Sequence, residues 1–388
     1  MDYRSLTLTS SDEFLELYSN KDHSLFSLHI EGEEKETLKQ ESLSLFNETG
    51  DEKRGLLYAY LALDGENEDE YPQAAEILET LSQTNDSDAI YLLSECTREG
   101  KGVGRDSTES FYLCKKAALL GNAMAEARLG VSYLRGYGVE KDVNEAIRCF
   151  EIAAEQEQPV ALYSLGVIFS DPGYKGYTPG LAFKYFARAA GQGSKEAYCR
   201  LGRAYKYGEG VRQDYTESYE WFLKAAESGN ANALDNLGLY NERGLGREKN
   251  IELAVSYYRQ AADLKYPSAQ RHLGLCYLEG KGVAKDPGKA FYYIKKAADQ
   301  NYPIAHYELG ILYRDGIGTQ RDEGMAFSCF LLASNSNIAP AQYELAKLYL
   351  YGENVTHDHV KAIRLLKTAA SHGNEDASDL LSDLGVEN

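Results

Sequence analysis

The amino-acid sequence predicts an all-α protein, a right-handed superhelical α/α solenoid built from stacked helix hairpins. Three features with one 36-residue period support this prediction: a leucine column, a glycine turn after it, and a helix-start residue after the turn. Because a two-helix unit cannot bury its apolar face alone, consecutive units are expected to stack on one another. The leucines recur without insertion or deletion at Leu57, Leu93, Leu129, Leu165, Leu201, Leu237, Leu273, Leu309, Leu345 and Leu381.

The first helix of each predicted unit, helix A, contains this leucine and ends at a glycine turn. A phosphate-binding loop would need one special copy with Lys-Ser or Lys-Thr after its last glycine. Here the same turn recurs in copy after copy, so we interpret the glycines as the bend between two helices. The first glycine of the turn is Gly100, Gly136, Gly208, Gly244, Gly280, Gly316 and Gly352, and the second is Gly102, Gly138, Gly210, Gly246, Gly282 and Gly318.

The second helix, helix B, is predicted to begin after a column of N-cap residue types. Side chains of these types accept a hydrogen bond from a free backbone N–H group of the first helical turn. Helix B ends in seven copies at a pair of alanines, such as Ala153 and Ala154, which lets neighbouring helices pack closely. The cap column comprises Asp106, Asp142, Thr178, Asp214, Asn250, Asp286, Asp322 and Asp358.

One copy departs from the pattern, with SDPGYKGYTPG at residues 170–180 in place of the glycine turn. Its length is unchanged, so the stack is expected to continue through it. Two interpretations remain open. The loop, with two tyrosines and Lys175, is either a contact site or a turn whose sequence has drifted, and we favour the drifted turn.

These columns closely resemble the Sel-1-like repeat family, a subgroup of tetratricopeptide-like α-solenoids. The resemblance covers residues 89–374, eight consecutive units, and implies a fold that binds other proteins. One copy shows the family pattern at Ala125, Leu129, Gly130, Tyr133, Gly136, Gly138, Val139, Asp142, Ala146, Ala153 and Ala154.

The ends of the chain are predicted to cap this array. Upstream of the regular units, Leu57 and Ala74 keep the register but the glycine pair is missing. Residues 11–50 resemble a further irregular hairpin that begins with a Ser-Ser-Asp-Glu cap at 10–13. We therefore expect an acidic helical segment (1–51), a degenerate capping repeat (52–88), eight repeats (89–374), and a C-terminal capping helix with its tail (375–388).

The charge of the chain limits its partners. The net charge is −19 over 388 residues. Residues 1–86 contribute −15 of this, from 21 acidic and 6 basic residues. Such acidity argues against nucleic acid and anionic lipid as general partners. Neither a secretory signal nor an 18-residue apolar stretch is visible, so we expect no membrane insertion and a cytoplasmic location.

Six cysteines without a common spacing favour free thiols in a reducing compartment: Cys96, Cys114, Cys149, Cys199, Cys276 and Cys329. No catalytic motif occurs, and we expect neither an enzyme nor a cofactor. His357-Asp358-His359 is not predicted to bind metal, because Asp358 belongs to the cap column. The resemblance raises a less likely alternative, the β-lactamase or penicillin-binding activity described for cysteine-rich relatives. The columns that hold paired cysteines in those relatives are alanine here.

The predicted function is a non-enzymatic adaptor or scaffold that binds a protein or extended peptide. In tetratricopeptide-like stacks helix A lines the concave groove, with exposed positions two before, two after and five after the leucine. Tyrosine and arginine dominate interface hot spots, and the basic side chains favour a ligand with acidic groups. The alternative is a structural spacer that recruits a basic partner through its acidic N-terminal segment, and no oligomeric state is predicted. The candidate binding residues are Tyr163, Arg203, Lys206, Arg271, Tyr307, Arg314 and Tyr343.

Overall fold

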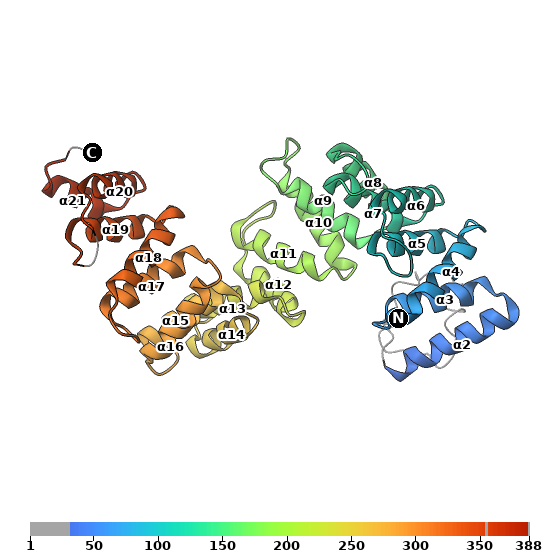
Figure 1. Ribbon diagram of the computed structural model, residues 1–388, viewed down its shortest axis with the longest axis horizontal. Coiled ribbons are helices and arrows are strands. Elements are labelled where there is room, and N and C mark those ends of the chain that lie inside the picture. Colours follow the sequence, from blue (N-terminus) through green and yellow to red (C-terminus); the bar gives the residue numbers. More distant parts are fainter. Residues whose placement is uncertain (1–31, 354–355, 387–388) are drawn as a thin grey trace. The chain divides into compact units, whose positions relative to one another are not determined.

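The computed structural model describes residues 32–353 and 356–386, and every regular element within these ranges is a helix (Figure 1). The chain forms two compact units, Met1–Ser194 and Lys195–Asn388. In each unit, consecutive helices pair into hairpins that pack on the next hairpin. The predicted all-α solenoid of helix hairpins is therefore confirmed.

The first unit begins with α2, where the sequence predicts an irregular N-terminal hairpin. The rest of that predicted hairpin, with its cap at residues 10–13, lies outside the described residues. The helices of this unit are α2 (Glu33–Thr49), α3 (Glu52–Leu63), a 3-10 helix (Glu68–Glu70), α4 (Tyr71–Ser82), α5 (Ser87–Glu99), α6 (Ser107–Leu119), α7 (Ala123–Arg135), α8 (Val143–Glu155), α9 (Pro159–Phe169) and α10 (Pro179–Gly191).

The second unit continues the same alternation, so that odd-numbered helices from α3 to α19 are A helices and the even-numbered helices after them are B helices. Its last helix, α21, is capped at its N-terminus by Asn374, whose side chain accepts a hydrogen bond from the N–H of Ala377. Its helices are α11 (Lys195–Tyr207), α12 (Tyr215–Glu227), α13 (Ala231–Arg243), α14 (Ile251–Asp263), α15 (Pro267–Glu279), α16 (Pro287–Ala298), α17 (Pro303–Asp315), α18 (Glu323–Asn335), α19 (Ala339–Tyr351), α20 (His359–Ser371) and α21 (Glu375–Asp383).

The leucine column and the residue after it form the contact between helices A and B. All ten leucines are at most 8% exposed. The following glycine lies under a large side chain of helix B, and a Cβ added at Gly310 would lie 2.6 Å from a ring carbon of Phe330. Where the glycine is replaced, the B-helix residue is smaller, as in the buried pair of Ala346 with Leu366. The two columns therefore fill one shared volume.

The two glycines of the turn have different roles. The first ends helix A in the left-handed conformation, as Gly136 does with φ 77°. The second also has positive φ, and it packs on the preceding hairpin: a Cβ at Gly138 would overlap the carbonyl oxygen of Ser107. Gly352 is an exception to the predicted equivalence of the turns, because its φ is −67°. In that copy the sequence has Asn354 at the position of the second glycine.

The cap column behaves as predicted in seven of its eight copies. Asp142 is typical, because its Oδ1 accepts from the N–H of Asn144 at 2.9 Å and of Glu145 at 3.1 Å. The prediction is wrong for Thr178, whose side chain accepts from none of the described N–H groups at the start of α10. Its hydroxyl instead donates to the carbonyl of Gly176 at 2.9 Å, because the altered loop places that carbonyl within reach.

The altered loop nevertheless closes in the same way as the glycine turns. The N–H of Thr178 donates to the carbonyl of Phe169 at 2.9 Å, as the N–H of Asp142 does to the carbonyl of Tyr133. The ring of Tyr174 packs edge-on against Phe169, with centroids 6.1 Å apart. These contacts explain how α10 keeps its place in the repeat without the glycine pair.

Candidate protein-binding surface

All seven candidate residues lie on A helices, at the positions predicted to face a ligand. Six are half-buried and Arg203 is exposed. Tyr163 belongs to the first unit and the other six to the second. In the second unit, α11 holds Arg203 and Lys206, α15 holds Arg271, α17 holds Tyr307 and Arg314, and α19 holds Tyr343.

Two of the candidate arginines pair with glutamates of the next A helix. Arg271 Nη2 lies 2.6 Å from Glu308 Oε1, and Arg314 Nη1 lies 2.8 Å from Glu344 Oε2. Arg314 also contacts Asp315, with Nε 2.7 Å from Oδ1. These guanidinium charges are compensated within the protein. The two arginines therefore offer less attraction to an acidic ligand than their residue type alone suggests.

The two basic residues of α11 differ in their surroundings. Lys206 Nζ donates to Asn236 Oδ1 at 2.7 Å and lies 5.2 Å from the ring centroid of Tyr207. Arg203 is exposed and forms no ion pair with any residue that the structure describes. Arg203 is therefore the candidate cation most available to a carboxylate of a partner.

The candidate tyrosines present an apolar ring and a polar tip. Tyr163 packs against Phe186 with ring centroids 5.8 Å apart, and Tyr307 against Phe330 with centroids 6.2 Å apart. Burial raises the pKa of Tyr307, so its hydroxyl stays protonated at neutral pH. Tyr343 has Lys347 Nζ 5.0 Å from its ring centroid. Such half-buried tyrosines suit recognition of an apolar side chain.

A further column of functional interest was missed from sequence, the residue directly before the repeated leucine. In five copies this residue forms a polar contact with the preceding A helix. A usable signal was an opposite charge in the preceding copy at another position of helix A, as in Arg271, two residues before its leucine, followed by Glu308. The five residues are Arg128, Asn236, His272, Glu308 and Glu344.

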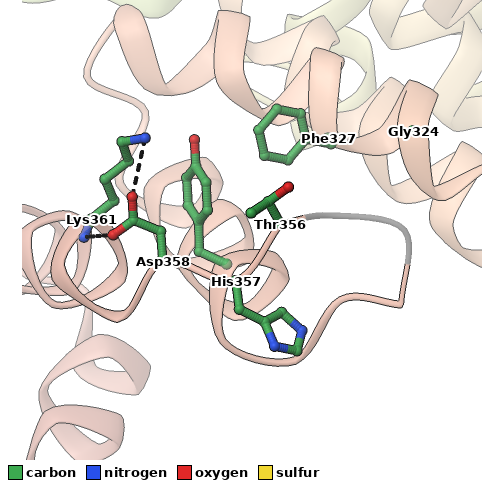
Figure 2. A pocket seen from close by; sticks show the side chains of 7 residues that line it. Gly324, Phe327, Thr356, His357, Asp358 and Lys361 are labelled. Carbon is green, nitrogen blue, oxygen red and sulfur yellow. Dashed lines mark hydrogen bonds and ion pairs between the residues drawn. The ribbon is translucent and has the colours of Figure 1, made fainter.

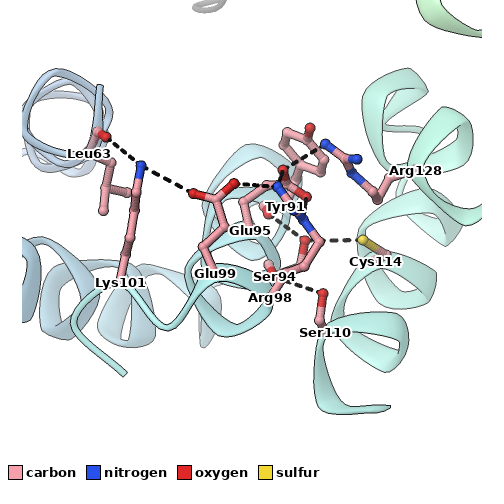
Figure 3. Close-up of polar contacts among 10 residues, drawn as sticks. All are labelled: Leu63, Tyr91, Ser94, Glu95, Arg98, Glu99, Lys101, Ser110, Cys114 and Arg128. Atoms are coloured by element: carbon pink, nitrogen blue, oxygen red, sulfur yellow. Dashed lines mark hydrogen bonds and ion pairs between the residues drawn. The ribbon is translucent and has the colours of Figure 1, made fainter. Parts of the chain in front are cut away.

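In the first unit this column links α5 to α7. Figure 3 shows Glu95 between Arg98 of its own helix and Arg128 of the next A helix. Glu95 Oε2 lies 2.7 Å from Nη2 of each arginine. The A-helix face of this unit is thus held by its own ion pairs, as it is in the second unit.

A second link in the second unit centres on Glu242 of α13. Its carboxylate accepts from Tyr258 Oη at 2.6 Å and from Lys281 Nζ, which belongs to the turn after α15. Burial by itself would raise the pKa of Glu242. The hydrogen bonds from Lys281 and Tyr258, together with the positive charge of Lys281, hold the pKa below its ordinary value. The carboxylate is therefore ionised at neutral pH.

The His357 region forms a small cavity of about 390 Å³ at the start of α20. Figure 2 shows the His357 ring directed away from the Asp358 carboxylate, which pairs with Lys361 Nζ at 3.1 Å. His357 Nε2 lies 2.9 Å from the carbonyl oxygen of Gly352. Among the described residues, no group of three or more His, Cys, Asp or Glu side chains is arranged to hold a metal ion.

Comparison with known proteins assigns the fold to a family. The Sel1 repeat model matches eight consecutive segments between residues 87 and 374. The chain therefore belongs to the Sel1 repeat family. No helix in the described part of the chain is long and apolar enough to span a membrane.

Three similar proteins illustrate this relationship. The crystal structure of a protective antigen from uropathogenic Escherichia coli strains is 29% identical, with a TM-score of 0.70 over 80% of this chain and 67% of that one. A Sel1 repeat protein from Oxalobacter formigenes is 25% identical, with a TM-score of 0.55 over 93% of this chain and 99% of that one. Chitin synthase regulatory factor 3 of Schizosaccharomyces pombe is 30% identical over 124 residues, 30% of this chain and 13% of that protein.

Proposed function

We propose that this protein is a non-enzymatic adaptor that binds a segment of another protein on the A-helix face of its repeats. The observation that supports it most directly is the pair of half-buried tyrosines Tyr307 and Tyr343, with the exposed and unpaired Arg203, on A helices of the second unit. The similarity to a chitin synthase regulatory factor agrees with a regulatory rather than a catalytic role.

The internal ion pairs refine the chemistry of the proposed ligand. Because Glu308 and Glu344 compensate Arg271 and Arg314, the second unit has little free positive charge on this face. The proposed ligand is therefore an extended segment with apolar side chains for Tyr307 and Tyr343 and one acidic group for Arg203. Arg271 and Arg314 would then act mainly by stabilising the stack.

Site-specific photo-crosslinking of the full chain tests the proposal. A photoreactive phenylalanine analogue at Tyr307 should crosslink to a partner protein in the native host, whereas the same analogue at Tyr112 should not. Tyr112 is 61% exposed and lies on a B helix, which makes it a matched control. With the partner purified, Arg203→Ala should weaken binding at least about tenfold, roughly 1.4 kcal/mol.

Two outcomes would contradict the proposal. Loss of binding on deletion of residues 1–50, with Tyr307→Ala and Arg203→Ala binding like the parent, would support the acidic spacer instead. Hydrolysis of a chromogenic cephalosporin by the purified chain would support the enzymatic alternative.

A further inference from the structure

Each B helix carries three equivalent positions, namely eight, two and one residues before the first position of the alanine pair near the helix end, and in every repeat these positions are exposed or half-buried. In α18 that alanine is Ala333, and the three positions hold Met325, Leu331 and Leu332. Each of the other seven repeats has at least one charged residue among these positions. The apolar triplet of α18 is therefore an exception within the chain's own pattern.

The triplet is exposed although the helix already has a complete buried face. Met325 is 43% exposed, Leu331 38% and Leu332 48%. The opposite side of α18 buries Ala326 and Phe330 fully in the core. Burial of the hairpin thus does not require the triplet. Apolar side chains exposed together on one face of a soluble protein commonly mark a site of interaction.

Basic residues flank the triplet on both sides. The equivalent positions are Lys289, Lys295 and Lys296 in α16, and Lys361, Lys367 and Thr368 in α20. These two helices are the neighbours of α18, because Ile294 of α16 shares a core cluster with Cys329, and Leu365 of α20 packs on the cluster that contains Phe330.

The local charge is opposite to that of the whole chain. Within their bounds the three helices contain five lysines, one arginine and one glutamate, a net charge of +5. Counting the aspartates beside the helix ends, Asp286, Asp299, Asp322 and Asp358, reduces this to +1, in a protein of net charge −19. Lys289, Lys295 and Lys361 pair with Asp286, Asp299 and Asp358. Lys296 and Arg364 are exposed and form no ion pair with described residues. Positive charge is therefore available on both sides of the apolar row.

We propose that the outward face of α18, together with the basic rows of α16 and α20, is a docking site for an acidic amphipathic helix of another protein. An α-helix with its side chains is about 10–12 Å wide. A helix laid over α18 places its apolar stripe on the triplet and its flanking Asp and Glu residues over the two basic rows. The exposed Lys296 and Arg364 beside the apolar triplet favour a helix of this kind over a basic or uncharged partner.

This site is separate from the proposed A-helix surface. It uses B-helix residues, and none of the seven candidate residues of the A-helix face takes part. Variants at Leu331 and Leu332 therefore test this inference, and variants at Arg203 and Tyr307 test the proposed function. Failure of one proposal leaves the other standing.

The test uses the full chain and a designed peptide of about five helical turns, with leucines on one stripe and glutamates on both flanks. Fluorescence anisotropy of the labelled peptide should show saturable binding that weakens with added salt. The double variant Leu331→Lys, Leu332→Lys gives α18 the two lysines that α16 has at the equivalent positions. It should weaken binding at least about tenfold, with unchanged helicity by circular dichroism. Ile152→Lys, at the position of α8 equivalent to Leu332, should change binding less than about twofold.

Four results would overturn the inference. The first is that the double lysine variant binds the peptide like the parent chain. The second is that a peptide with lysines in place of its glutamates binds equally well. The third is that the chain sediments with phosphatidylcholine–phosphatidylserine vesicles and the double variant does not, which would indicate that α18 binds a lipid surface. The fourth is that the chain self-associates in analytical ultracentrifugation and the double variant does not, which would indicate that α18 contacts a second copy of the chain.

Discussion

At the scale of single residues, Asp142 and Thr178 occupy the same position of the repeat but make different hydrogen bonds. Asp142 caps α8, whereas the Thr178 hydroxyl donates into its own loop. Residue type alone placed both in one column, because aspartate and threonine are both good N-cap residues. The difference arises from the loop before Thr178, where the path of the backbone decides which group the hydroxyl reaches.

This difference predicts unequal costs for the same substitution. Asp142→Ala removes two hydrogen bonds to the first turn of α8 and should lower the free energy of unfolding by about 1 kcal/mol. Thr178→Ala should cost clearly less, because no cap bond is lost. Both residues lie in the first unit, so urea unfolding followed by circular dichroism compares them directly. Equal costs would mean that the cap bonds contribute nothing measurable.

At the scale of helix pairs, the residue after the leucine and the B-helix residue twenty positions later share one volume. Glycine with phenylalanine fills it at Gly310 and Phe330, and alanine with leucine fills it in the next repeat, at Ala346 and Leu366. The sequence indicated that these columns contain small and large residues. It did not indicate that the two columns touch, because that contact depends on how the hairpin closes.

The shared volume predicts compensation between two substitutions. Gly310→Ala should destabilise the second unit by about 1–3 kcal/mol, because its Cβ overlaps the Phe330 ring. Adding Phe330→Leu recreates the pair of the next repeat and should recover part of that loss. The measurement is a double-mutant cycle of unfolding free energies. Strictly additive costs would show that the two side chains do not compete for space.

The link from Glu242 to Lys281 predicts a pH-dependent contribution to stability. The pKa of Glu242 lies below the ordinary value of 4.5, so the stabilisation is complete above pH 4.5 and is lost as the pH falls through the lower folded-state pKa. Lys281→Met should therefore cost about 0.5–1 kcal/mol at pH 7 and much less in acid. Urea unfolding across this pH range checks it, with Lys249→Met as an exposed control. Parallel stability curves for parent and Lys281→Met would rule out the link.

At the scale of the whole molecule, the periodic features were predictable and the features that break the period were not. The leucines recur in every repeat and the glycines and caps in most of them, so each copy supports the interpretation of the others. The division after Ser194 has no signal, because the 36-residue spacing continues unchanged across it. The ion pairs of Arg271 and Arg314 were missed because each column was considered alone, although each pair joins two repeats.

The six cysteines determine the thiol chemistry of the whole chain. All six are free thiols in the structure, and five are buried. Burial raises the pKa of Cys96 and Cys149 to about 12, and that of Cys114, Cys276 and Cys329 to about 11. Thiolates, which are the reactive form, should therefore be rare at these five sites near pH 8. Cys199 is the most accessible of the six.

Thiol labelling then separates a reducing from an oxidising compartment. Burial also raises the pKa of the half-buried Cys199, so we expect the native chain to react slowly with iodoacetamide and first at Cys199, a label that Cys199→Ser removes. After denaturation without reductant, mass spectrometry should count six labels, since the thiols of a chain folded in a reducing compartment stay unpaired. Four labels or fewer would indicate disulfides. Such a result would favour an oxidising compartment and would renew the comparison with the cysteine-rich members of the family.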